Sequence, residues 1–363
     1  MCETVRKENI GKTEVYITQD ADQVKEKIAD YVEGGLVAIL YDMKLKEYAD
    51  SLARCFRGGN HMVFSTCIQG EIPAHTRFII GVGAGTVSAL TRQKATELNV
   101  ECALVFSAPT TDTILTENQH KNHKAVFIDE GLVGSCPKEC IASGWGIVLA
   151  EPLAIFEDYY SEKILDENCF ERRTKCLPCE NDNVNLALCL LGMSGVKVRK
   201  DNATVMAEVL YHTLRAKGGV TRLMGEYRFI SASVISALYE SYLSSPSLDC
   251  AIPPAHDLNM DVLAKLVGKP MDKLLKQFDF LSIDGYFRVG YILSEYRLDL
   301  LDKLRMVDFH SAQKRWRRIY PDAGYWLKSA FTTNSLLTAM KLSAEVGHGL
   351  LRYICESGFA EAC

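Results

Sequence analysis

The sequence predicts an α/β domain with a parallel sheet, followed by an all-α domain. Short apolar runs alternate with amphipathic stretches over about the first 130 residues, which is the pattern of alternating strands and helices. One apolar run passes directly into a glycine-rich turn within residues 78–94. Strand-like runs end at Pro137. With 363 residues the chain is long enough for two domains, which we assign to residues 1–134 and 135–363.

The first domain divides into strands and helices by its hydrophobic periodicity. The strands that we expect are residues 36–41, 62–65, 78–80, 103–106 and 125–128. The helices that we expect are residues 24–31, 45–56 and a stretch that ends near residue 98. Because the strands are continuously apolar rather than alternating, the sheet should be parallel and covered on both faces.

The second domain shows only helical periodicity. The amphipathic segments are residues 137–164, 183–198, 203–217, 226–243, 259–278, 290–306, 308–318 and 334–357. Prolines punctuate the later segments, and there are no repeats or low-complexity linkers. We therefore expect two tightly packed domains with a ligand cleft between them.

Composition excludes several classes of function. The chain is 48% hydrophobic and 24% charged, with a net charge of −5, so it offers no basic surface for nucleic acid or anionic membranes. The basic run at 314–318 (KRWRR) is better explained as a solvated helix face than as a phosphate-binding patch. The longest apolar run, 186–192, is too short to span a bilayer.

The cysteines indicate a reducing compartment. The N-terminus lacks the apolar region of a secretory signal, and the 13 cysteines are an odd number scattered among core-like elements. We therefore expect reduced thiols in a cytoplasmic protein. Cys176 and Cys179 form a single C-x-x-C pair, whereas a structural zinc site usually needs two.

The most informative stretch is residues 78–94 (FIIGVGAGTVSALTRQK). Glycines at 81, 83 and 85 follow an apolar strand, and Thr86 and Ser88 open a helix. Glycine allows close approach of the backbone to a phosphate, and free N–H groups at a helix N-terminus hold negative charge. A nucleotide site and a plain strand–helix turn both remain open on this motif alone.

Asp42 and a second polar loop stand at the ends of neighbouring strands. Asp42 follows the strand at 36–41, where an acid can accept hydrogen bonds from a ribose or cap the next helix. Thr110, Thr111 and Asp112 follow the strand at 103–106. Both are positioned to line the same edge of a doubly wound sheet.

The order of these segments resembles the iron-containing alcohol dehydrogenase and dehydroquinate synthase superfamily, and most of all its glycerol-1-phosphate dehydrogenase branch. Gly83-Ala84-Gly85-Thr86-Val87-Ser88 resembles the pyrophosphate loop of that family. Residues 107–112 (SAPTTD) resemble its segment along the nicotinamide. Residues 125–129 (AVFID), with Cys136-Pro137 and residues 144–146 (GWG), resemble its entry into the helical domain. The resemblance implies a dehydroquinate synthase-like fold, NAD or NADP, one divalent metal and a homodimer.

The positions that hold the metal in that family are substituted in this chain. In the register of the resemblance, Ile147, Val209 and Met224 occupy the places of its carboxylate and two histidines. None of these side chains suits zinc or ferrous iron, so we expect no metal at the family's site. Glu151, Glu208 and His212 are the nearest residues from which a site could be rebuilt.

Three hypotheses about function remain. The first is an NAD(P)-dependent oxidoreductase that acts on a small hydroxyketone or polyol, or its phosphate, with His212, Lys217 or Arg222 donating a proton or hydrogen bond in place of the metal. NAD is favoured over NADP, because Asp42 would repel a 2′-phosphate. The second is an NAD(H)-binding or regulatory protein that has lost catalysis. A cyclase of the dehydroquinate synthase type is a weaker third hypothesis, since it also needs the metal.

Overall fold

The computed structural model describes residues 5–32, 34–57, 61–115, 120–164, 182–194, 201–216, 222–245, 283–321, 333–346, 350–356 and 359. The chain folds into two compact units. Unit 1 comprises Met1–Gly144 and Arg173–Lys197, and unit 2 comprises Trp145–Arg172 and Val198–Cys363. This division differs from a single boundary at 134/135, because a later helical segment returns to unit 1.

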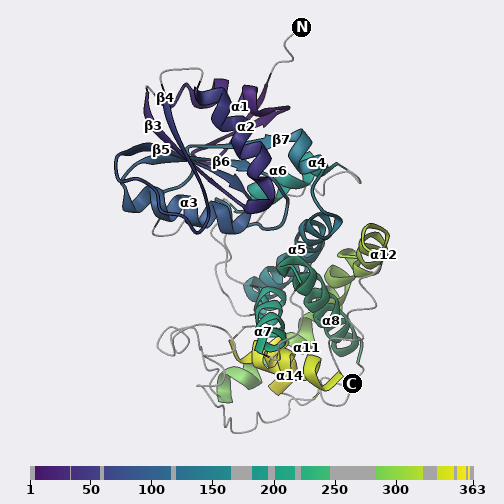
Figure 1. Cartoon of the computed structure of the whole chain (residues 1–363). Helices are drawn as coiled ribbons and strands as arrows, with labels where there is room; N and C mark the ends of the chain where they lie inside the picture. Colours follow the sequence, from purple (N-terminus) through teal and green to yellow (C-terminus); the bar gives the residue numbers. More distant parts are fainter. Residues whose placement is uncertain are drawn as a thin grey trace. The chain divides into compact units, whose positions relative to one another are not determined.

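Unit 1 is built on one seven-stranded sheet (Figure 1). In sequence the strands are β1 (Arg6–Ile10), β2 (Thr13–Thr18), β3 (Gly35–Tyr41), β4 (His61–Cys67), β5 (Thr76–Gly83), β6 (Glu101–Phe106) and β7 (Ala125–Asp129). Their order across the sheet is β1-β2-β7-β6-β5-β3-β4. Every neighbouring pair is parallel except β1 and β2, which are antiparallel.

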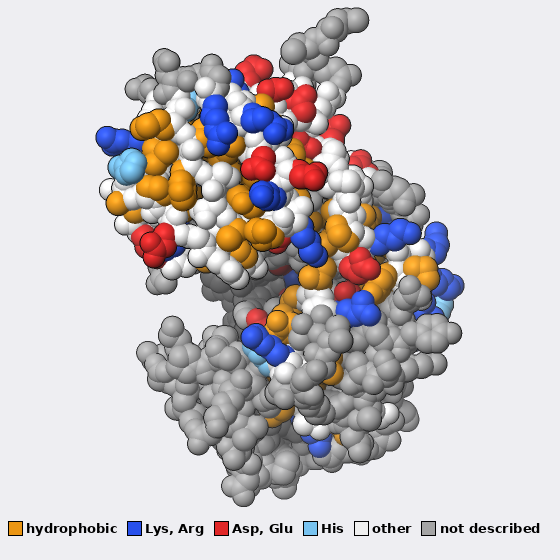
Figure 2. Space-filling view, in the orientation of Figure 1, with side chains coloured by type: hydrophobic (Ala, Val, Ile, Leu, Met, Phe, Trp, Pro, Cys, Tyr) orange, Lys and Arg blue, Asp and Glu red, His pale blue; other side chains and the backbone are white. Residues whose placement is uncertain are grey.

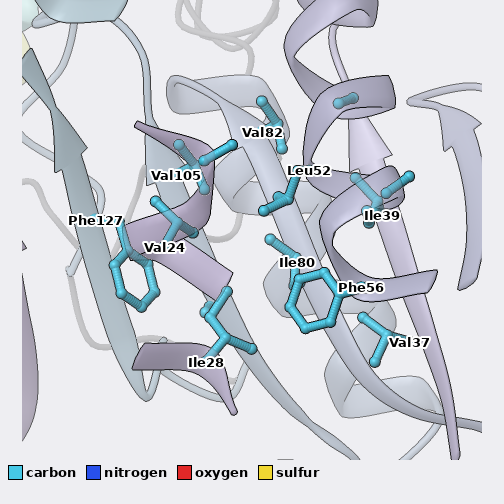
Figure 3. Packing of buried hydrophobic residues seen from close by; sticks show 14 of the residues in the cluster. Val24, Ile28, Val37, Ile39, Leu52, Phe56, Ile80, Val82, Val105 and Phe127 are labelled. Atoms are coloured by element: carbon cyan, nitrogen blue, oxygen red, sulfur yellow. The ribbon is translucent and has the colours of Figure 1, made fainter. Parts of the chain in front are cut away.

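Helices cover both faces of the sheet. On one face, α1 (Ala21–Ile28) and α2 (Lys46–Arg57) pack Val24, Ile28, Leu52 and Phe56 against apolar side chains of the strands (Figure 3). On the other face lie α3 (Gly85–Glu97) and α6 (Asn183–Ser194). Both faces of the central strands are therefore buried, which explains their continuously apolar sequences.

The predicted fold class is confirmed, with two corrections in unit 1. All five expected strands are present, extended by one to five residues. No strand was expected within residues 6–18, which form the antiparallel hairpin of β1 and β2. Residues 183–198 were expected in the helical domain, whereas α6 packs Ala187 and Leu191 against β6 and β7. A helix pattern alone does not identify the surface on which the helix packs.

Unit 2 is helical throughout its described residues. Its helices are α5 (Lys138–Ile164, which begins in unit 1), α7 (Asn202–Ala216), α8 (Met224–Ser244), α11 (Ile283–Met306), α12 (Phe309–Ile319), α14 (Thr333–Val346) and α15 (Leu350–Glu356). The predicted segment 259–278 lies outside the described residues. Gly146 of α5 lies so close to the Gly225 carbonyl of α8 that a Cβ at this position would clash.

One helix in the described part of the chain, α5, is long and apolar enough to cross a membrane by length and composition. Of its most apolar window, 72% is buried inside the protein, as in the core helix of a folded domain. The helix also carries the buried acid Glu151 and the half-buried acid Glu157. These features make α5 weak evidence for a membrane span.

Candidate nucleotide-binding site

The sheet of unit 1 has a topological switch point between β3 and β5. From β3 the chain crosses through α2 to β4 at the sheet edge, and from β5 it crosses through α3 to β6 in the opposite direction. In such sheets a crevice for ligands opens outside the carboxyl ends of the two strands. The Asp42 N–H donates to the Val82 carbonyl at 3.2 Å, which holds the two strand ends together. Asp42 and the glycine turn thus flank this point.

The three glycines of the turn have different structural roles. A Cβ at Gly83 would lie 2.7 Å from the Cβ of Val87, and one at Gly81 would clash with the Thr91 hydroxyl. These two glycines let α3 pack closely on its own strand. A Cβ at Gly85 would lie 3.0 Å from Thr111, so this glycine brings the start of α3 against the loop after β6.

The N-terminus of α3 is open where comparable N-termini are capped. Asp20, Asp42 and Asp129 follow β2, β3 and β7, and each accepts a hydrogen bond from the backbone of the helix that it precedes. At the corresponding position of α3, Ala84 makes no side-chain cap. Its first-turn N–H groups therefore carry the helix dipole without a capping side chain.

Asp42 performs the helix-capping role that was one of its two interpretations. Its Oδ1 accepts from the Lys44 N–H at 2.9 Å and its carbonyl accepts from the Leu45 N–H at 2.8 Å. The side chain is half-buried. One capping hydrogen bond leaves lone pairs on a carboxylate, so the ribose interpretation stays a prediction.

Ser88 points into unit 1. Its hydroxyl lies 2.8 Å from His123 Nε2, and the other ring nitrogen lies 3.5 Å from the Cys102 thiol. Burial, helped by the charge of Arg92, lowers the pKa of His123 to about 3, so the ring is neutral at physiological pH. Thr86, by contrast, is exposed on the first turn of α3. Of the two predicted hydroxyls, Thr86 is the accessible one.

The polar loop after β6 lies beside the start of α3. Ser107 donates its N–H to the Gly83 carbonyl at 3.0 Å, and Thr110, Thr111 and Asp112 are half-buried. The Ser143 hydroxyl donates to the Thr110 carbonyl at 3.4 Å. The loop is thereby tied to β5 and to the first turns of α5, which keeps its side chains at the carboxyl edge of the sheet.

The candidate catalytic residues belong to unit 2. Arg222 donates from Nη1 to the Tyr320 hydroxyl at 2.7 Å, and its N–H donates to the Tyr227 hydroxyl at 3.3 Å. His212 is half-buried on α7, with its ring edge-to-face on Tyr211. Lys217 lies outside the described residues.

The substituted metal positions are also in unit 2. Ile147 and Val209 are buried, whereas Met224 is 36% exposed at the first position of α8. Within the described ranges, no group of three or more His, Cys, Asp or Glu side chains could hold a metal ion. The donor chemistry of Ile147, Val209 and Met224 does not fit zinc or iron, and we derive no step through a metal.

Glu151, one turn beyond Ile147, is part of a buried ion-pair network. Arg228 donates from Nη2 to Asp201 at 2.9 Å and lies 3.3 Å from Glu151, and all three side chains are less than 10% exposed. Asp201 also accepts from the N–H and hydroxyl of Thr204 at the start of α7. Glu151 is thus held in an ion pair, an arrangement that competes with its use as a metal ligand.

A second acid in the same region, the half-buried Glu157, was not predicted from the sequence. Glu157 accepts from the N–H and side-chain amide of Asn202 at 3.0 and 2.9 Å, and from the Tyr239 hydroxyl at 2.7 Å. Burial, with a contribution from the charge of Asp201, raises the pKa of Glu157 to about 7. Isolated charges inside the otherwise apolar α5 and α8 were the signal that could have identified this network.

Comparisons with known proteins give structural similarity only. No family model and no curated protein matches the chain. Glycerol dehydrogenase from Schizosaccharomyces pombe is 15% identical, with a TM-score of 0.47, over 84% of this chain and 90% of its own. A probable glycerol dehydrogenase from Sinorhizobium meliloti 1021 is 12% identical, with a TM-score of 0.49, over 83% of this chain and 100% of its own.

Maleylacetate reductase from Rhizobium sp. strain MTP-10005 is 12% identical, with a TM-score of 0.45, over 99% of this chain and 97% of its own. These proteins are of the kind that the sequence resembles, and the similarity spans most of both chains. At identities of 12–15% and TM-scores below 0.5, it assigns no activity, substrate or residue role to this chain.

Proposed function

We propose that unit 1 binds a dinucleotide, with its pyrophosphate at the N-terminus of α3. The observation that carries this proposal is the uncapped first turn of α3, which begins at Gly85, directly after Gly83 and Ala84 at the switch point of the sheet. An aspartate closes the helix N-termini after β2, β3 and β7 to anions, whereas α3 offers N–H groups and an exposed hydroxyl on Thr86.

The neighbouring residues suit the remainder of such a cofactor. Asp42 stands at the end of β3, where a carboxylate accepts hydrogen bonds from ribose hydroxyls and disfavours a 2′-phosphate. Thr110, Thr111 and Asp112 offer hydroxyl and carboxylate groups along the other side of the α3 N-terminus. The carboxylate of Asp42 therefore favours NAD over NADP.

The reaction that we propose is hydride transfer between the nicotinamide and a small hydroxyketone or polyol, or its phosphate. Reduced nicotinamide would supply the hydride to the ketone, and oxidised nicotinamide would accept it from the polyol. The protein must then stabilise the oxygen of the substrate with a hydrogen-bond donor, a role for which His212, Lys217 and Arg222 are the candidates. Since the family's metal positions hold Ile147, Val209 and Met224, this activity would be slow and insensitive to chelators.

One observation favours an alternative, an NAD(H)-binding regulatory protein. Ile147 and Val209 lie in the core of unit 2, and the Arg222 guanidinium is bonded to Tyr320. These side chains then serve to stabilise the unit. Dinucleotide binding without turnover of any hydroxyketone or polyol would select this alternative.

A charge at Thr86 tests the dinucleotide site without threatening the fold. Thr86→Glu places a carboxylate in the first turn of α3. There its charge stabilises the helix through the dipole and repels a pyrophosphate. Calorimetric titration with NADH should show binding to the wild type and the neutral Thr86→Gln, and at least about a hundredfold weaker binding to Thr86→Glu. The melting temperature of Thr86→Glu should not fall. Equal affinity of all three proteins would refute the site.

A further inference from the structure

Arg92 is a buried side chain on α3, the helix whose N-terminus forms the proposed dinucleotide site. In the space-filling view, Lys, Arg, Asp and Glu side chains are scattered over the visible face of unit 1 (Figure 2). Among the Lys and Arg residues that the structure describes in unit 1, Arg92 alone is buried, with 3% of its surface exposed. A guanidinium is withdrawn from water in this way only where acceptors meet it inside the protein.

Three acceptors of Arg92 belong to the connection between β6 and β7. Its Nε donates to the Lys121 carbonyl at 3.0 Å, and its Nη2 donates to the side-chain oxygen of Asn122 at 2.8 Å. Its Nη1 donates to the Ile114 carbonyl at 3.3 Å. One guanidinium therefore binds the connection at two places, one shortly after the polar loop that follows β6 and one just before β7.

The residues one turn before and one turn after Arg92 extend this contact. The Thr96 hydroxyl accepts from the Lys121 N–H at 2.8 Å, and the Ser88 hydroxyl lies 2.8 Å from His123 Nε2. Ser88, Arg92 and Thr96 are four residues apart, so they lie along one side of α3. This polar stripe (Ser88, Arg92 and Thr96) binds successive residues of the connection and fixes the connection on the helix.

Ile114 joins the polar stripe to the proposed dinucleotide site. It lies two residues after Asp112, the last of the three polar residues predicted to line the site. Earlier in the same loop, Thr111 lies so close to the start of α3 that a Cβ on Gly85 would be 3.0 Å from it. The hydrogen bond from Arg92 therefore holds the end of this loop, while its middle lies beside the first turn of α3.

We infer that Arg92 is a positioning residue for the nicotinamide half of the dinucleotide, an inference that rests on the proposed function of unit 1. Because Arg92 is buried, it acts through the loop rather than by touching the ligand. It keeps the hydroxyl and carboxylate groups of residues 110–112 at the start of α3. The adenosine half, on the side of Asp42, does not depend on this loop. A small displacement of the loop should therefore weaken binding of one half of the ligand only.

Two ligands separate this role from a general effect on the fold. NADH has both halves of the dinucleotide, whereas ADP has only the adenosine half and the pyrophosphate. In calorimetric titrations, Arg92→Met should lower the affinity for NADH about tenfold and the affinity for ADP by less than about twofold. A residue that only stabilised the fold would change both affinities alike, or neither.

A second variant and a matched control complete the comparison. Arg92→Lys keeps the buried charge, but its single nitrogen cannot reach all three acceptors together. Its affinity for NADH should also fall relative to that for ADP, and it replaces Arg92→Met if that protein does not fold. Lys94→Met is the control, because Lys94 pairs with Glu97 at 2.8 Å and both side chains are more than one-third exposed. It should leave both affinities unchanged.

Hydrogen exchange tests the loop directly and without a ligand. The Leu115 N–H donates to the Ser194 hydroxyl at 3.1 Å, one residue after the carbonyl that Arg92 holds. In the Arg92 variants this amide should exchange about tenfold faster than in the wild type, while the amides of β3 exchange at the wild-type rate.

Equal losses of affinity for NADH and ADP, or an unchanged ratio of the two in both Arg92 variants, would overturn the inference. So would a changed ratio in Lys94→Met, or wild-type exchange of the Leu115 amide in both Arg92 variants. In each of these cases the wild type still binds NADH, and the proposed function stands. A wild type that bound neither ligand would overturn the proposed function and the inference together.

Discussion

Unit 1 and unit 2 use polar groups in opposite ways. In unit 1 the strand interiors are apolar, and the polar groups stand at the carboxyl ends of the strands, where the first turn of α3 is left without a cap. In unit 2 the ionised groups lie inside the helical core and bind one another, with Arg228 between Glu151 and Asp201. Unit 1 therefore has an open polar edge that can receive an anion, whereas unit 2 has a closed polar network that stabilises its fold.

The largest effect is expected where the closed network is broken. Arg228→Met leaves two buried carboxylates without the guanidinium, so the free energy of unfolding should fall by about 3–5 kcal/mol. Arg305→Met is the control, because Arg305 pairs with Glu240 at 3.9 Å and both are more than half exposed; it should change stability by less than about 1 kcal/mol. Urea unfolding measures both. Similar losses in the two variants would contradict a closed network in unit 2.

The second effect is a pH dependence that originates at Glu157. Its folded-state pKa of about 7 lies above the ordinary value of 4.5, so the folded protein binds the proton more tightly than the unfolded chain does. The stability from this group is therefore complete below about pH 4.5 and is lost as pH rises through 7, with a size on the order of 3 kcal/mol.

Glu157→Gln isolates this contribution, because the amide keeps an oxygen acceptor and does not ionise. Unfolding curves at several pH values between 5 and 8 should show wild-type stability falling relative to that of the variant. If the free energies of unfolding of the two proteins differed by a constant amount over this range, Glu157 would not be the group that titrates.

The smallest effect concerns the open edge of unit 1. Asp42→Asn keeps an oxygen that caps the 3₁₀ turn η1 (Met43–Leu45), so stability should stay within about 0.5 kcal/mol of the wild type. Without the negative charge, the affinity for NADP relative to that for NAD should rise roughly tenfold. Competition calorimetry with the two cofactors measures the ratio. An unchanged ratio would remove Asp42 from the proposed site.

Much of unit 1 could be predicted from sequence because its signals are local. A buried parallel strand shows a continuous apolar run, and the glycines at 81, 83 and 85 mark a tight strand–helix turn. The hairpin of β1 and β2 was missed because β1 is a charged edge strand without an apolar run. The burial of Ser88 was missed because its partner, His123, is 35 residues away.

Unit 2 was predicted less completely because its decisive contacts join distant helices. Sequence position placed Glu151 one turn from Ile147, but only the fold brings Arg228 and Asp201 to it. The hydrogen bonds to Glu157 come from Asn202 and Tyr239, on two other helices. Helical periodicity identifies which face of a helix is buried, but not which charges meet inside.

We propose that the open N-terminus of α3 binds a dinucleotide without help from a metal. NADH titrated calorimetrically into chelator-treated protein tests it most directly. We predict binding of one dinucleotide per chain, with an affinity that does not change when zinc or ferrous iron is added back. No binding to the chelated protein, or binding that returns only with the metal, would contradict the claim.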